Sequence, residues 1–167
     1  GVEDTLMYTY DRFIGHNEVG DSPDLFGHEA GQFHRQMVER QTRFPMSMNS
    51  TSTHDTKRGE DVRARLNVLT DLGGKWLKVV DQWQKLCREF NFDAGPDAND
   101  RYLIYQTLCG FYPLPGQPED DIEARLHAYL TKALREAKVH SNWADPDPDY
   151  EKATLDFASY LLDRDKP

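Results

Sequence analysis

Apolar residues recur at spacings of three and four along most of the chain, a pattern typical of helices that pack one face on a core. The pattern predicts helices within residues 2–14 and 24–43, which Gly15 and Pro45 close. After Gly59 it predicts helices only, with breaks at Gly73–Gly74, 91–99, 113–115 and 145–148. One of the later apolar stripes comprises Trp76, Val80, Trp83, Cys87 and Phe90. The chain is therefore predicted to be mainly α, with about six or seven helices.

Residues 45–58 break the helical pattern. Met46 and Met48 alternate with small polar residues, and a run of hydroxyl side chains follows as far as Thr53. This predicts one or two short strands, the clearest near 46–51, running into a polar loop. A single strand has no neighbour for its backbone hydrogen bonds, so either it does not form or its sheet lies outside this chain. The start at Gly1 favours the second explanation and a piece of a longer protein.

Charge and composition exclude several classes of protein. The 167 residues include 29 acidic and 20 basic side chains, a formal net charge of −9, which argues against binding to nucleic acid or to an anionic membrane surface. Aromatic residues make up 11% of the chain, too many for a disordered segment. Cys87 and Cys109 are too few for a disulfide framework, and no secretion signal or apolar membrane run is present. A cytoplasmic chain with reduced thiols is expected.

The densest set of candidate chemical groups lies at 50–61. His54, Asp55, Lys57 and Arg58 bring an imidazole, a carboxylate and two cations together directly after the predicted strand. In a (β/α)8 barrel, catalytic side chains lie where strands end. An ordinary loop explains the same residues, with Asp55 or Thr56 capping the next helix, and residue types alone favour this structural explanation.

Other candidates are weaker. His28 and His34 are six positions apart, which does not place both imidazoles on one helix face for a metal. Trp143 lies in a polar turn, where it either packs on the surface or stacks on a sugar. No glycine-rich phosphate loop and no CxxC motif occurs.

Several blocks together resemble one enzyme family, the maltooligosyltrehalose synthases. The resembling blocks are 1–5, 17–20, 51–58, 60–65, 105–108, 132–140, Trp143 and 150–151. They follow the family's order and extend over nearly the whole chain, which resembles an internal slice of a much larger enzyme.

The resemblance implies an activity and a site. The family belongs to the α-amylase clan and converts the reducing-end α-1,4 bond of a maltooligosaccharide into an α,α-1,1 bond by retaining chemistry. It implies that Asp55 is a catalytic carboxylate that steadies the charged sugar ring, and that His54 hydrogen-bonds sugar hydroxyls. Lys57 and Arg58 are implied substrate-binding residues, and Asn17 and Glu18 are expected to line the cleft. No metal or organic cofactor is implied, and no nucleic acid or membrane partner.

The resemblance also implies a division of the chain. Residues 1–70 are expected to be a barrel-derived segment, with the seventh barrel strand near 46–51, and 71–167 an all-helical insertion. No block resembles the family's nucleophile or acid, so the chain alone is expected to be inactive. Two alternatives stay open: a fragment of another hydrolase or transferase of the clan, and a non-catalytic helical interaction module.

Overall fold

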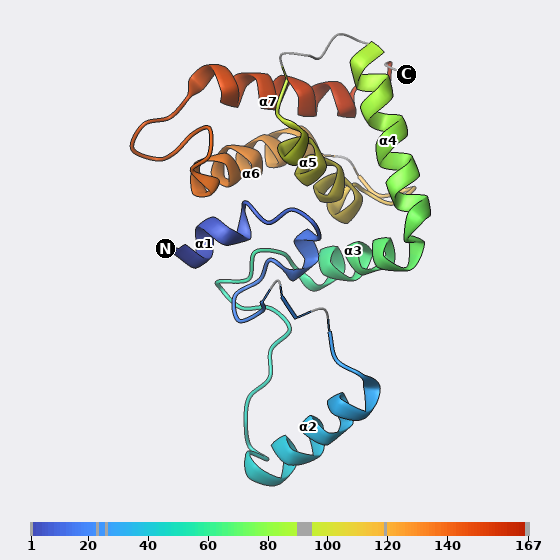
Figure 1. Ribbon diagram of the computed structural model, residues 1–167, viewed down its shortest axis with the longest axis vertical. Coiled ribbons are helices and arrows are strands. Elements are labelled where there is room, and N and C mark those ends of the chain that lie inside the picture. Colours follow the sequence, from blue (N-terminus) through green and yellow to red (C-terminus); the bar gives the residue numbers. More distant parts are fainter. Residues whose placement is uncertain (1, 23, 26, 90–94, 119, 166–167) are drawn as a thin grey trace.

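The computed structural model describes residues 2–22, 24–25, 27–89, 95–118 and 120–165. These ranges hold seven α-helices and one 3-10 turn, arranged as in Figure 1. The elements are α1 (Val2–Met7), η1 (Ile14–His16), α2 (Ala30–Arg43), α3 (Glu60–Leu72), α4 (Gly74–Glu89), α5 (Ala98–Phe111), α6 (Ile122–Ala137) and α7 (Pro148–Leu162). The prediction of a mainly helical chain is confirmed.

The predicted helices after Gly59 are present, and Gly73 separates α3 from α4 with a positive φ of 49°. The N-terminal helices are shorter than predicted, because α1 ends at Met7 and α2 begins only at Ala30. Phe90 and residues 91–94, part of a predicted stripe and its linker, lie outside the described residues.

The predicted strand near 46–51 is wrong for this chain. Residues 46–51 form turns and irregular backbone, and no strand occurs anywhere in the described ranges. Met46 and Met48 are 92% and 96% exposed, so the alternating pattern buries nothing here. A strand is stabilised by hydrogen bonds to a neighbouring strand, and the described residues offer none.

Two buried clusters hold the helices together. The first joins α4, α5, α6 and α7 and comprises Trp76, Val80, Cys87, Ile104, Tyr105, Leu126, Leu130, Phe157 and Ala158. The second joins the N-terminal segment to α3, α5 and α6 and comprises Met7, Tyr8, Ile14, Leu66, Leu103, Ala133 and Ala137. Residues 2–16 therefore pack into the helical body. None of the described helices combines the length and apolar character needed to span a bilayer.

Helix α2 lies apart from the other helices, at the lower end of the molecule in Figure 1. It buries no residue, although Phe33, Met37 and Val38 are the side chains expected to face a core. Its helix is nevertheless regular over 14 residues. The local apolar period thus predicts the helix correctly but not its burial within this chain.

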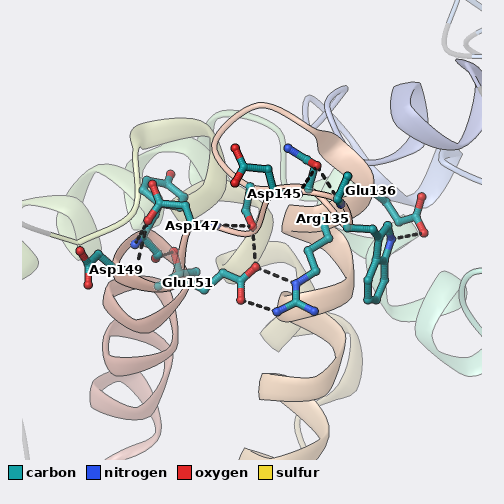
Figure 2. A network of polar contacts seen from close by, with 12 residues as sticks. Arg135, Glu136, Asp145, Asp147, Asp149 and Glu151 are labelled. Carbon is teal, nitrogen blue, oxygen red and sulfur yellow. Dashed lines mark hydrogen bonds and ion pairs between the residues drawn. The ribbon is translucent and has the colours of Figure 1, made fainter.

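A polar network fixes the turn between α6 and α7 (Figure 2). Arg135 donates two hydrogen bonds to the Glu151 carboxylate, at 2.7 and 2.8 Å. These bonds, together with one from Ser141, lower the pKa of Glu151 against the opposing effect of burial. The Asp147 carboxylate caps α7 by accepting from the backbone N–H groups of Asp149 and Tyr150. The turn is therefore held rigid without a large apolar cluster.

The N-terminal segment is fastened to α5 by a buried amide. Gln106 is fully buried; its Oε1 accepts from the Ile14 backbone N–H at 3.0 Å, and its Nε2 donates to the Asp11 carbonyl at 2.7 Å. Six-residue α1 is too short to be stable alone, so such anchors decide its position.

We expect Gln106→Met to destabilise the chain by about 2–4 kcal/mol, because two buried backbone groups lose their partners while the side-chain volume is kept. Urea unfolding followed by circular dichroism measures the change. Gln36→Met on exposed α2 is the matched control and should alter the stability by less than about 0.5 kcal/mol. Equal stabilities of the two variants would contradict this role of Gln106.

Asp11, in the same segment, is a buried acid. It is 2% exposed, and its Oδ2 accepts from Asn99 Nδ2 at 2.7 Å, while its Oδ1 has no partner among the described residues. Burial, reinforced by the charge of Asp100, raises the pKa of Asp11 to about 7.

Folding therefore favours protonated Asp11, so its contribution to stability is complete below pH 4 and is lost as the pH rises towards 7. In Asp11→Asn this loss is absent, and the variant should gain up to about 4 kcal/mol over the wild-type chain between pH 4 and pH 8. Urea unfolding at both pH values tests this. Parallel pH profiles of the two proteins would show that Asp11 ionises normally.

Candidate functional site

Asp55 lies at the tip of a hydrogen-bonded turn that returns the chain from α2 to the helical body. The Thr56 backbone N–H donates to the Thr53 carbonyl at 3.3 Å, and the Thr53 N–H donates to the Thr56 hydroxyl at 2.7 Å. His54 and Asp55 are both exposed, and the Asp55 side chain keeps 54% of its surface accessible. The turn therefore presents an imidazole and a carboxylate to the surroundings.

Lys57 follows this turn, and its ammonium group contacts two carboxylates. Its Nζ is 3.6 Å from Asp55 Oδ1 and 3.2 Å from Asp4 Oδ1, and its side chain is only 10% exposed. Burial opposes the charge of the ammonium, but the hydrogen bond to Asp4 and the neighbouring negative charges prevail and raise the pKa of Lys57. Lys57 is therefore charged at neutral pH, and its ammonium is shared between the carboxylates of Asp4 and Asp55.

Glu18 fastens the chain that follows the turn. Its Oε2 accepts from the Lys57 backbone N–H and its Oε1 from the Arg58 backbone N–H, both at 2.7 Å. Glu18 itself is 8% exposed. One carboxylate thus satisfies two successive backbone donors from a segment about 40 residues away.

Arg58 is a second anchor of the same segment. Its guanidinium donates to the Tyr129 hydroxyl of α6 at 2.7 Å and to the Asn17 carbonyl at 3.4 Å. The Asn17 side chain in turn donates to the carbonyls of Met7 and Tyr10, at 2.9 and 2.7 Å. These contacts connect the turn to the N-terminal segment and to α6.

The beginning of α3 holds the other side of the loop. Glu60, in the first turn of α3, accepts hydrogen bonds from the hydroxyls of Thr51 and Ser52. These hydrogen bonds, that of Thr51 first, lower the pKa of Glu60 to about 2. Gly59, rather than Asp55 or Thr56, is the N-cap residue of α3. The loop explanation that uses Asp55 as the helix cap is therefore wrong, and the Asp55 carboxylate is left available.

The structure separates the sequence-predicted residues into two groups. His54 and Asp55 are exposed, whereas Asn17, Glu18 and Arg58 are buried and bonded to the chain itself. Two contributors were missed. Asp4 lies in the block 1–5, for which the resemblance implies no role, and Tyr129 lies at apolar helical spacing on α6, which gives no sign of a polar contact.

A cavity of about 210 Å³ adjoins the anchored end of the loop. Its lining comprises Lys57, Arg58, Gly59, Val62, Thr107, Phe111, Arg125, Leu126 and Tyr129. A larger cavity of about 320 Å³ between α4, α5 and α7 is lined mainly by apolar side chains and includes none of the residues predicted for the site.

Other clusters are explained by structural contacts. Asp97, Asp100 and His140 are close enough to hold a metal ion, but Asp97 caps α5 and accepts from His140, and Asp100 accepts from the Tyr150 hydroxyl. His28 and His34 are exposed on or beside α2. Trp143 is 55% exposed, with its indole N–H bonded to Glu136 and one face against Arg135.

The arrangement at residues 54–58 suits one kind of chemistry. An exposed carboxylate stabilises a positive charge that develops on a bound ligand, and a neighbouring imidazole exchanges hydrogen bonds with hydroxyl groups. Retaining hydrolysis or transfer at a sugar also needs a nucleophile and an acid about 5–5.5 Å apart.

Comparisons with known proteins agree with one another. The chain is 37% identical over 162 residues to a protein of Mycobacterium tuberculosis strain H37Rv named as a maltooligosyl trehalose synthase, covering 97% of this chain and 20% of that protein. The fold matches a Sulfolobus tokodaii protein of the same name with a TM-score of 0.85 at 34% identity, over 97% of this chain and 22% of that one. It also matches a glycosyltrehalose synthase from strain DSM5389 with a TM-score of 0.83 at 38% identity, over 99% and 21% of the two chains.

The chain thus spans about a fifth of the length of the relatives it matches. No protein-family model matches it.

Proposed function

The chain belongs with the maltooligosyl trehalose synthases, which it matches in sequence and fold along about a fifth of their length, and we propose that it supplies part of the active site of such an enzyme. The substrate of that enzyme is a maltooligosaccharide, and its product ends in trehalose. The reaction converts the α-1,4 bond at the reducing end into an α,α-1,1 bond by an intramolecular transfer. The enzyme is assigned to the α-amylase clan.

Asp55 is the catalytic residue of this proposal. In retaining glycosyl transfer the sugar ring passes through states of oxocarbenium character, with positive charge near the anomeric carbon. An ionised Asp55 stabilises that charge. The observation that carries the proposal is the exposed Asp55 carboxylate 3.6 Å from a charged Lys57 that it shares with Asp4.

The neighbouring residues bind the sugar and complete the site. His54, exposed beside Asp55, exchanges hydrogen bonds with sugar hydroxyls. Lys57 forms an ion pair with Asp55, and Arg58 anchors the loop through its hydrogen bond to Tyr129. The nucleophile and the acid come from the remaining part of the enzyme. We also assign residues 1–70 to its barrel part, residues 71–167 to a helical insertion, and the whole enzyme to the cytoplasm.

In a full-length enzyme that contains this segment, we expect Asp55→Asn to lower kcat by about 10³-fold or more, because the amide carries no charge to set against the sugar cation. Turnover of maltopentaose to a trehalose-terminated product measures the effect. Asp71→Asn, at an exposed position of α3, is the matched control and should leave kcat unchanged.

Two outcomes would replace this proposal. Nearly normal turnover by Asp55→Asn would favour a non-catalytic helical interaction module. Release of glucose or shorter maltooligosaccharides as the main products of the unmodified full-length enzyme would favour a hydrolase of the clan.

The chain on its own should give no detectable turnover of maltopentaose, because a charge-stabilising carboxylate without nucleophile and acid does not complete the reaction. Product chromatography after prolonged incubation tests this, with the full-length enzyme as the positive control. A trehalose-terminated product formed by the chain alone would show that it carries a complete site.

A further inference from the structure

Glu18 connects the N-terminal segment to the loop that carries Asp55. Its two carboxylate oxygens accept from the consecutive N–H groups of Lys57 and Arg58, both at 2.7 Å. Both oxygens are thereby engaged with the chain itself, and the residue is 8% exposed. A side chain so placed has little capacity left for contact with a substrate.

We propose that Glu18 is a positioning residue for Asp55, and that Asn17, Arg58 and Tyr129 complete the same anchor. The inference rests on the proposed function, because it assigns how the catalytic carboxylate of that function is held. It differs from the role that the sequence resemblance implies for Asn17 and Glu18, which is to line the substrate cleft.

The anchor is effective because it acts two residues from Asp55. The N–H groups of residues 57 and 58 are fixed by Glu18, and the Thr53–Thr56 turn sets the backbone on the other side of the carboxylate. Little free backbone is left between these two restraints. Charged hydrogen bonds at a buried site are stronger than neutral ones, so the carboxylate holds the loop better than an amide would.

The anchor also reaches the helical body. Arg58 is 7% exposed and carries the connection to the Tyr129 hydroxyl on α6, 71 residues further along the chain. Asn17 ties the same region to the Met7 and Tyr10 carbonyls. Helix α6 therefore contributes to the candidate site by supporting the loop.

The test uses two readouts. In the chain itself, hydrogen exchange followed by NMR reports on the Lys57 and Arg58 amides. Glu18→Gln should speed their exchange by about tenfold or more, because a carboxamide offers one acceptor oxygen for two donors. Amides in the middle of α5 and α6 should exchange as before. Glu3→Gln, at an exposed position of α1, is the matched control and should change neither set.

In a full-length enzyme that contains the segment, Glu18→Gln should lower kcat about 10- to 100-fold and leave KM within about threefold, since a displaced carboxylate weakens the transition state more than substrate binding. Glu3→Gln should match the unmodified enzyme. Unchanged kcat, or a raised KM with normal kcat as expected of a cleft-lining residue, would overturn the proposal. Unchanged exchange of both amides would do the same.

Tyr129→Phe serves if Glu18→Gln does not fold, because it removes one hydroxyl and keeps the ring. It should lower kcat severalfold at constant KM, and a normal kcat would count against the anchor. Asp55→Asn, assayed in parallel, separates the two proposals. If that variant is active, the proposed function fails. If it is inactive while Glu18→Gln has normal kcat, only the positioning role fails.

Discussion

The hydrogen bonds from the Lys57 and Arg58 backbones to the Glu18 carboxylate are the interaction on which the candidate site depends. Residues 44–56, which follow α2, are largely exposed and have no regular structure. Neither strand hydrogen bonds nor an apolar cluster therefore holds this described segment. The loop is held by the turn at 53–56, by Glu60, and at its end by the buried Glu18 carboxylate. Two charge-assisted hydrogen bonds therefore fix the position of the loop end, where a sheet or an apolar core would fix it in other proteins.

The same physical solution recurs throughout the N-terminal segment. Gln106 accepts from a backbone N–H group of this segment, and Asn17 donates to a backbone carbonyl within it. Arg58, which contacts the segment, donates to the Tyr129 hydroxyl. A six-residue helix buries too little apolar surface to fix its own position, whereas a satisfied buried polar group fixes direction as well as distance. Asp11 shows the disadvantage of burying polar groups. Its Oδ1 has no hydrogen-bond partner among the described residues, and burial raises its pKa.

Electrostatics links these anchors to the proposed chemistry. The chain carries a formal net charge of −9. The two cations near Asp55 also make contacts with other groups. Lys57 is shared with Asp4, and Arg58 is directed to Tyr129 and the Asn17 carbonyl. The Asp55 carboxylate stays exposed, as stabilisation of a cationic sugar ring requires.

Local sequence was sufficient for the helices after Gly59, because apolar spacing, Gly73–Gly74 and the Asp147–Pro148 cap act within a few residues of one another. It overestimated the length of the two helices before Gly59. It also predicted a polar loop after residue 51, and the structure forms a hydrogen-bonded turn there at 53–56. It could not decide the strand near 46–51, since strand formation depends on a neighbouring strand and not on alternation. Nor could it pair Glu18 with Lys57, 39 positions later, or Arg58 with Tyr129, 71 positions later, since those contacts exist only once helices from distant parts of the chain have packed.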